Sequence, residues 1–154
     1  MKVAVATDHG GFPLKTTVLD AVRAAGHDPL DLGTHSADPV DYPDLAAAAA
    51  RAVQDGRAER AIVLCGSGVG AAVAANKLAG IRAGVCHDVY SAHQAVEHDD
   101  VNVLALGARV IGASLAAELV QTFLAARYTA EPRHARRLAK VIALERDQRG
   151  DRHA

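Results

Sequence analysis

The sequence predicts an α/β fold built on a doubly wound, five-stranded parallel sheet with helices on both faces. Half of the 154 residues are apolar but only 3% are aromatic, so the core consists mainly of Ala, Val and Leu. Short β-branched runs alternate with longer Ala-rich stretches of helical period. Strands covered on both faces are continuous apolar runs of this kind, and their alternation with helices favours right-handed βαβ crossovers.

Five apolar runs are the predicted strands. They cover residues 2–7, 29–33, 61–65, 81–86 and 101–106. Between them, apolar side chains recur at the period of a helix. One such face consists of Leu14, Val18, Leu19 and Val22, and a later one of Leu115, Leu119, Val120, Phe123 and Leu124. The arrangement is Rossmann-like, and such sheets bind ligands beyond the carboxyl ends of their strands, where the strand order reverses.

The C-terminal segment is predicted to form one more helix, over about residues 131–150. Pro132 suits a first helical position, because that position needs no hydrogen-bonded N–H group. Arg133 and Arg137 lie four residues apart, so they share one face of this helix. The chain is about as long as one domain, and residues 1–154 are predicted to form a single one.

Charge and hydropathy exclude several classes of partner. The chain has 17 Lys and Arg against 18 Asp and Glu, so no overall field attracts nucleic acid or an anionic membrane. No apolar run approaches the ~20 residues of a membrane-spanning helix, and the first apolar stretch is too short for a signal peptide. Two cysteines without paired spacing make neither a disulfide framework nor a zinc site. We therefore expect a cytoplasmic protein without nucleic-acid, membrane or metal partners.

A glycine-rich loop follows the third predicted strand and opens a helix. Gly66, Gly68 and Gly70 allow main-chain N–H groups to point at an anion near the positive end of that helix, and Ser67 is a candidate cap. A tight strand-to-helix turn without a ligand is the alternative. One glycine usually suffices for such a turn, so three of them favour a ligand.

Cys65 ends the third predicted strand, immediately before this loop. There the helix dipole and the free N–H groups favour a thiolate, although cysteine is also a common small core residue. Cys86 ends the next strand with no glycine loop after it, and we interpret it as structural.

The same loop also reads as Gly-x-Gly-x-x-Ala, with Asp88 about twenty residues further on, which resembles a dinucleotide-binding fingerprint. A nucleotide-binding or regulatory module without catalysis therefore stays open as an alternative. Two features speak against it: the motif follows the third strand rather than the first, and the chain leaves no room for a separate substrate domain. A Cys-x5-Arg phosphatase loop is excluded because Ala71 stands where the arginine is required.

Further polar residues stand at the predicted strand ends. Asp8 and His9 follow the first strand and offer a carboxylate and an imidazole to a cleft there, while a helix cap and a surface histidine are the simpler interpretation. His98 is a candidate acid or base, or it is an ordinary surface residue. Arg109 follows the fifth strand.

Eight segments, in order along the chain, resemble those of type B ribose-5-phosphate isomerases and their relatives, the galactose-6-phosphate isomerases. They are DHGGF (8–12), DYP (41–43), CGSGVG (65–70), AANK (74–77), GIRA (80–83), YSA (90–92), NVLALGARV (102–110) and RHARR (133–137). The resemblance implies an aldose-ketose isomerase without metal or cofactor that converts ribose 5-phosphate through an enediolate. It also implies a homodimer, or a tetramer of two dimers, in which the C-terminal helix contacts the partner and each active site is shared.

The resemblance further implies a role for each matching residue. Cys65 is the base that moves a proton between C1 and C2, and His98 opens the sugar ring with Asp8 opposite it. The main-chain amides of the loop form an oxyanion hole, contributed by Gly66, Ser67, Gly68, Val69 and Gly70. Tyr42 lies near the sugar. The phosphate is bound by His9, Arg109, Arg133 and Arg137, the last two from the partner subunit.

The sequence departs from the family pattern at Asp99, where the family commonly has asparagine. An amide donates hydrogen bonds to sugar hydroxyls and an ionised carboxylate does not, so Asp99 either changes the accepted sugar or points to solvent. A tetrose or hexose phosphate therefore stays open as the substrate. Family members without the cysteine carry glutamate just after the loop, but this chain has Ala71 there, so Cys65 has no visible substitute.

Overall fold

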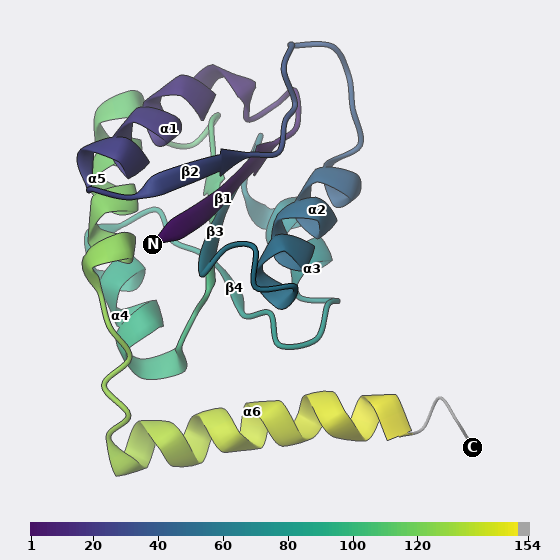
Figure 1. The fold of residues 1–154 in the computed structure, drawn as a ribbon, viewed down its shortest axis with the longest axis vertical. Helices are drawn as coiled ribbons and strands as arrows, with labels where there is room; N and C mark the ends of the chain where they lie inside the picture. Colours follow the sequence, from purple (N-terminus) through teal and green to yellow (C-terminus); the bar gives the residue numbers. More distant parts are fainter. Residues whose placement is uncertain (151–154) are drawn as a thin grey trace.

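The computed structural model of the chain describes residues 1–150, so the last four residues of the predicted domain, 151–154, lie outside the described part. All five predicted strands are present in one parallel sheet of order β2-β1-β3-β5-β4 (Figure 1). Their bounds are β1 Lys2–Thr7, β2 Asp28–Asp31, β3 Arg60–Cys65, β4 Ala83–Val85 and β5 Val103–Gly107. The α/β fold class is confirmed. β4 is shorter than predicted, because the N–H of Arg82 donates to the side chain of Asn102.

Helices cover both faces of the sheet. One face carries α1 (Lys15–Ala24), preceded by the short 3-10 turn η1 (Phe12–Leu14), together with α4 (Val89–Asp99) and α5 (Ala113–Ala125). The other carries α2 (Tyr42–Gln54) and α3 (Val69–Ala75). The predicted helical faces are confirmed, with Leu19 and Leu115 only partly buried; the fully buried residues include Val18, Val22, Leu119, Val120, Phe123 and Leu124.

The two faces have cores of different composition. Bulky side chains such as Ile62, Leu104 and Phe123 fill the space beneath α1, α4 and α5. The space beneath α2 and α3 is filled largely by alanines, among them Ala46, Ala49, Ala50, Ala52, Ala71, Ala72 and Ala75. Small side chains let α2 and α3 approach the sheet closely, which places the first turns of both helices near the carboxyl ends of the strands.

The strand order reverses between β1 and β3. From β1 the chain crosses to β2 on one side, and it then returns to β3 on the other side. Crevices form at the carboxyl ends of strands at such a point. The residues that follow β1 and β3, beginning with Asp8 and ending with the glycine loop after Cys65, flank this crevice.

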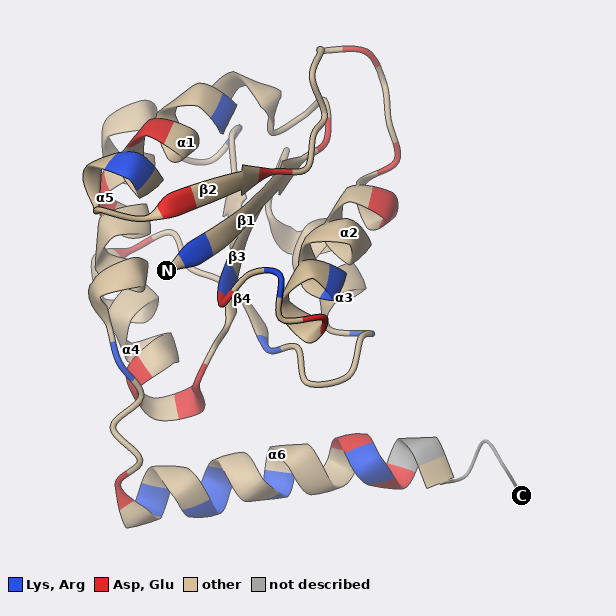
Figure 2. Ribbon diagram, in the orientation of Figure 1, with Lys and Arg blue, Asp and Glu red and all other residues tan. Residues whose placement is uncertain are grey.

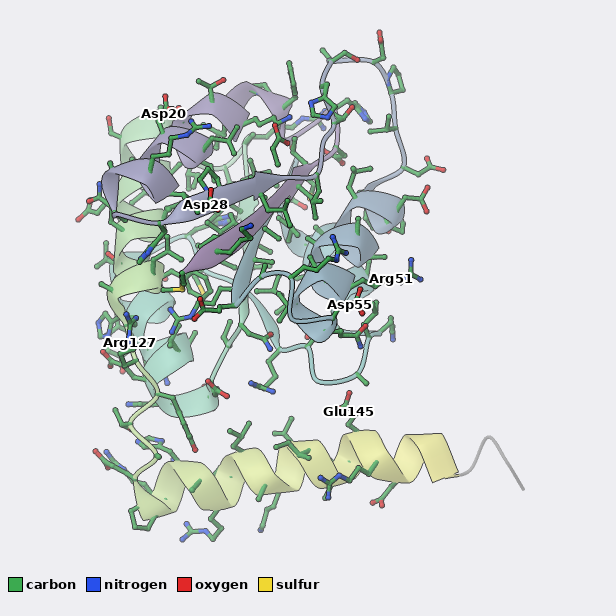
Figure 3. The ribbon with its side chains drawn as sticks, viewed as in Figure 1. Asp20, Asp28, Arg51, Asp55, Arg127 and Glu145 are labelled. Carbon is green, nitrogen blue, oxygen red and sulfur yellow. The ribbon has the colours of Figure 1, made fainter. Side chains whose placement is uncertain are left out.

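The last helix, α6 (Pro132–Gly150), begins at Pro132 as predicted and lies outside the two helical layers, beneath the amino ends of the strands (Figure 1). Its first half carries Lys and Arg but no acidic residue (Figure 2). Glu145 points from α6 toward the sheet and accepts a hydrogen bond of 2.7 Å from the N–H of Gly80 (Figure 3). Val141 and Leu144 remain 53% and 65% exposed, so much of the apolar stripe of α6 is unpartnered in one chain.

None of the helices in the described part of the chain is long and apolar enough to cross a membrane.

Candidate active site

Cys65 is the last residue of β3, and the glycine loop turns directly over its sulfur. The N–H of Gly68 donates to Sγ at 2.9 Å. Gly68 has a φ of +81° and is the residue before α3, which explains why glycine stands at this point of the turn. A hydrogen-bond donor at the sulfur stabilises negative charge that develops there. Ser67 is not the helix cap; its hydroxyl accepts only a 3.3 Å bond from the N–H of Val69.

The remaining amides of the loop form a row of open donors beside the sulfur. Among residues 1–150, no acceptor lies within hydrogen-bond distance of the N–H groups of Gly66, Ser67 and Gly70. The N–H of Gly66 is uncovered because residue 10 is also glycine: a Cβ on Gly10 would lie 3.0 Å from that nitrogen. Successive main-chain N–H groups in a turn make an anion-binding concavity. Of the five predicted oxyanion-hole amides, those of Gly68 and Val69 already have acceptors in the loop.

The two cysteines differ in their surroundings. Cys65 is 5% exposed and lies at the floor of the loop, beside Ala71 and Ala105 of the alanine-rich core. Cys86 is equally buried but receives no such N–H donor from the described residues, and burial together with the charge of Asp88 raises the pKa of its thiol to about 11. Cys86 therefore stays protonated at neutral pH, as expected of a structural cysteine.

Asp8 and His9 stand at the carboxyl end of β1. The buried carboxylate of Asp8 accepts a 2.9 Å hydrogen bond from the N–H of Gly11, so Asp8 holds the turn into η1 in addition to facing the crevice. The Nδ1 atom of His9 accepts a bond of 3.3 Å from the N–H of Val40. Neutral His9 thus carries its proton on Nε2, where it is available to an oxygen of a bound anion.

Arg109 and Tyr42 close the two sides of the loop. The guanidinium of Arg109 lies over Gly66, where a Cβ would be 3.4 Å from Nη1, and the main-chain N–H of Arg109 donates to the Gly66 carbonyl at 3.0 Å. The ring of Tyr42, the first residue of α2, lies against Gly70, where a Cβ would be 3.0 Å from Cε2. We call this group the carboxyl-edge cluster; it consists of Asp8, His9, Tyr42, Cys65, the loop 66–70 and Arg109.

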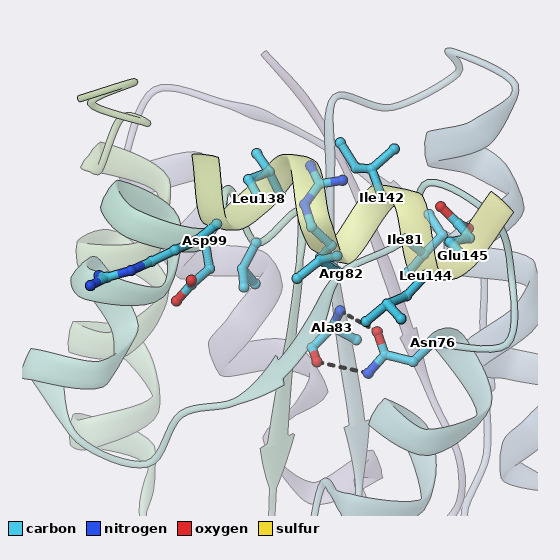
Figure 4. Close-up of a pocket in the computed structure, with 12 residues that line it drawn as sticks. Asn76, Ile81, Arg82, Ala83, Asp99, Leu138, Ile142, Leu144 and Glu145 are labelled. Atoms are coloured by element: carbon cyan, nitrogen blue, oxygen red, sulfur yellow. Dashed lines mark hydrogen bonds between the residues drawn. The ribbon is translucent and has the colours of Figure 1, made fainter. Parts of the chain in front are cut away.

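The other predicted site residues lie at the opposite edge of the sheet. Helix α4 runs back from the carboxyl end of β4, so His98 and Asp99 in its last turn reach the amino edge. Asp99 and Arg137 line a groove of about 420 Å³ between α6 and the sheet, which Figure 4 shows together with Ile81, Arg82 and Leu138.

Arg133 is one turn before Arg137 on α6, and its guanidinium pairs with Glu131 at 3.0 Å. We call His98, Asp99, Arg133 and Arg137 the amino-edge cluster. The length of the sheet separates it from Cys65 in the same chain.

Two neighbours of His98 were not predicted. The ring of His134 stacks on that of His98, with centroids 4.0 Å apart and planes at 23°. His134 is 2% exposed, and burial, followed by the nearby positive groups of His98 and Arg133, lowers its pKa. The amide nitrogen of Gln94 lies 2.8 Å from Nδ1 of His98. Gln94 precedes His98 by four residues. In a helix this spacing places both side chains on one face, so the sequence alone could have indicated Gln94 as a neighbour of His98.

The alternative of a dinucleotide site loses support from the sheet order. The fingerprint needs its acidic residue on the strand next to the glycine loop. Here β5 lies between β3 and β4, and the Asp88 carboxylate accepts a 2.7 Å bond from the N–H of Ser91 as the cap of α4. In residues 1–150, no three His, Cys, Asp or Glu side chains are grouped so as to hold a metal ion.

Comparison with known proteins places the chain among sugar isomerases. Residues 3–141 match the family model described as Ribose/Galactose Isomerase. Ribose-5-phosphate isomerase B of Escherichia coli is 43% identical over 144 residues, which are 94% of this chain and 96% of that protein. D-erythrulose-4-phosphate isomerase of Pectobacterium atrosepticum is 41% identical over 83% of this chain and 85% of its own length. The structure of ribose-5-phosphate isomerase B of Clostridium thermocellum superposes with a TM-score of 0.93 at 44% identity, covering 96% of this chain and 99% of that one.

Proposed function

The chain belongs to the ribose/galactose isomerase family, and we propose that it interconverts ribose 5-phosphate and ribulose 5-phosphate by proton transfer through an enediolate. The observation that carries the proposal is the sulfur of Cys65 beneath a row of open main-chain amides at the point where the strand order reverses. These are the two parts that the reaction needs: a base, and donors placed where charge develops.

The chemistry follows from these two parts. The thiolate of Cys65 removes the proton from C2 of the open-chain aldose, and the electron pair moves to the C1 oxygen to give an enediolate. The thiol returns that proton to C1, and transfer of the O2 proton to O1 completes the ketose. A proton next to a carbonyl is weakly acidic, so the step also depends on donors at the oxygen. The open amides of Gly66, Ser67 and Gly70 supply them.

The two clusters combine when two copies of the chain pair. We propose a homodimer, alone or as half of a tetramer, in which the carboxyl-edge cluster of one subunit faces the amino-edge cluster of the other. The phosphate then lies between His9 and Arg109 of one chain and Arg133 and Arg137 of its partner. The exposed apolar stripe of α6 supports this arrangement, because it leaves Val141 and Leu144 free to pack against a second copy.

Ring opening precedes proton transfer. In the proposed dimer, His98 of one subunit and Asp8 of the other face the ring oxygen and the C1 hydroxyl of the cyclic sugar. A donor gives a proton to the ring oxygen while an acceptor takes the hydroxyl proton, and the ring bond breaks. Tyr42 lines the sugar beside Gly70, and Asp99 faces its hydroxyls from the partner's side.

A four-carbon substrate is the second candidate. The relative from Pectobacterium atrosepticum, 41% identical to this chain, acts on D-erythrulose 4-phosphate, and Asp99 introduces a carboxylate near the sugar hydroxyls. A four-carbon sugar offers the Asp99 carboxylate fewer hydroxyl groups as hydrogen-bond donors than ribose does. We therefore rank the tetrose phosphate second and the hexose phosphates behind it.

We propose a cytoplasmic location. Both cysteines are free thiols, and the reaction uses one of them as a thiolate. A reducing compartment keeps that thiol available.

The experiment is a substrate panel with wild-type protein and Asp99→Asn, in which ketose formation is measured for the four-, five- and six-carbon aldose phosphates. We expect the highest kcat/KM with ribose 5-phosphate, and a change in the ranking of substrates for Asp99→Asn. A higher kcat/KM with the tetrose phosphate would assign the second candidate. Saturable binding of NAD or ATP without any sugar-phosphate turnover would refute isomerase function.

A further inference from the structure

We propose that Gln94 and His134 are positioning residues that orient the ring of His98 and place its proton on Nε2. This inference rests on the proposed function, which gives His98 its role in ring opening. The two observations that carry it are the contact between the Gln94 amide and Nδ1, and the stack of the two imidazole rings.

Gln94 fixes the tautomer. Gln94 and His98 lie one turn apart on α4, and the Nε2 atom of Gln94 is 2.8 Å from Nδ1 of His98. An amide nitrogen has two hydrogens to donate and accepts none, so Nδ1 is the acceptor in this contact. The proton of the neutral ring is therefore on Nε2. That N–H group then donates a hydrogen bond to a sugar oxygen.

The same helix provides a contrasting pair. His93 and Glu97 are also four residues apart, and Nδ1 of His93 lies 3.0 Å from a carboxylate oxygen of Glu97. A carboxylate accepts from Nδ1 and stabilises the imidazolium form. An amide does neither. The two pairs have the same spacing on the same helix. The charge of the partner side chain is therefore what distinguishes His98 from His93.

His134 fixes the ring plane. It covers one face of His98 and is itself 2% exposed, and its Nε2 has no hydrogen-bond partner in the described residues, with a Glu131 oxygen 3.8 Å away. Burial, the largest cause, lowers the pKa of His134 and favours its neutral form. A neutral ring in the stack orients His98 without adding a charge beside it.

Charged groups near the pair lie on α4, at the start of α6 and on α5. Those on α4 and directly after it are Glu97, Asp99 and Asp100, and those at the start of α6 are Glu131, Arg133 and Arg137. Glu97 is paired with His93, Asp100 with Arg82, and Glu131 with Arg133. Helix α5, which also packs on α4, carries one charged residue, the exposed Glu118.

The first test measures the tautomer in the intact protein, independently of activity. Nitrogen-15 NMR of the histidine rings distinguishes Nδ1–H from Nε2–H, and His98→Asn assigns the signals of His98 by their loss. We expect Nε2–H for His98 and Nδ1–H for His93. A wild-type protein with Nδ1–H at His98 would overturn the inference.

The second test uses opposite substitutions at Gln94. Gln94→Glu places a carboxylate at Nδ1, so we expect Nδ1–H and an acidic limb of the kcat profile about one pH unit higher. Gln94→Leu removes the amide that donates to Nδ1. We therefore expect a mixture of both tautomers and about a tenfold lower kcat, without the shift of the acidic limb. Glu97→Gln is the matched control; it changes the signals of His93 and leaves those of His98 and the kcat profile unchanged.

The third test separates stacking from folding at His134. We expect His134→Ala to lower kcat and His134→Phe, which keeps a flat neutral ring, to restore most of it. Wild-type activity together with unchanged pH profiles and tautomers in both Gln94 variants contradicts this inference alone. Absence of activity on every sugar phosphate in the wild type contradicts the proposed function instead, while the NMR result still decides the tautomer.

Discussion

At the scale of single residues, a few atoms around each thiol decide what the two cysteines do. Cys65 ends a strand beneath a left-handed glycine whose N–H reaches its sulfur. Cys86 also ends a strand region, but burial and Asp88 raise the pKa of its thiol to about 11. The glycine spacing after Cys65 made this difference visible in the sequence, because only one of the two cysteines is followed by such a loop.

We expect replacement of Cys65 to remove the base. Cys65→Ala should lower kcat by at least about 10²–10⁴-fold, the usual contribution of a positioned base, with little change in KM because the thiol is at the floor of the site. Cys86→Ala is the matched control, with kcat near the wild-type value. Steady-state ketose formation measures both, and near-wild-type kcat in Cys65→Ala would contradict the assignment.

The open amide of Gly66 gives a second prediction. Gly10→Ala places a Cβ about 3.0 Å from the Gly66 nitrogen and covers its N–H. We expect kcat to fall by about 10²-fold, as for loss of one oxyanion-hole donor in other enzymes. Gly112→Ala is the control, since a Cβ there meets no atom within 4 Å. If Gly10→Ala kept wild-type kcat while folding normally, the Gly66 amide would have no part in the reaction.

Residues that act through a neighbour were harder to predict than residues that contact the substrate. Gln94 belongs to no motif, and His134 was noted only as part of the segment RHARR; the structure singles both out by their contacts with the ring of His98. Asp8, in contrast, was predicted from the sequence as a site residue. Its carboxylate faces the crevice and also supports the turn by accepting a hydrogen bond from the N–H of Gly11.

At the scale of elements, the direction of α4 decides where the predicted site residues lie. The alternating pattern predicted all five strands, because covered parallel strands are apolar throughout. It also implies that a helix leaving the carboxyl edge ends at the amino edge, which is where His98 lies. The strand order and the position of α6 were not predicted, since they depend on packing between elements far apart in the sequence.

The docking of α6 should depend on pH through His134. Its pKa is lowered below the ordinary value of 6.5, so below that pH the unfolded chain binds more protons than the folded one. The contribution of His134 to the free energy of unfolding is therefore fully present above about pH 6.5, and it is lost as the pH falls below that value.

We expect the melting temperature of the wild type to fall between pH 6.5 and 5 more than that of His134→Phe. Thermal unfolding followed by circular dichroism measures this, with His35→Asn, a substitution in the exposed loop after β2, as control. Parallel curves for the wild type and His134→Phe would show that the buried imidazole makes no difference to stability.

At the scale of the whole molecule, the predicted site residues of one chain lie at two opposite edges of the sheet. Cys65 and the loop amides are at the carboxyl edge, while His98 and the arginines of α6 are at the amino edge. No rotation of a side chain spans the sheet between them. If these residues act together, a second copy has to supply the missing half, and two-fold symmetry then completes two sites at once.

This arrangement predicts that two inactive chains restore activity together. In a heterodimer of Cys65→Ala with His98→Asn, one site receives both substitutions and the other receives neither. With differently tagged chains purified as the heterodimer, we expect about half of the wild-type kcat, since one of two symmetric sites is intact. Both parent homodimers are the controls and should be inactive. If each chain held a complete site, every site of the heterodimer would carry a substitution, and the mixture would stay as inactive as its parents.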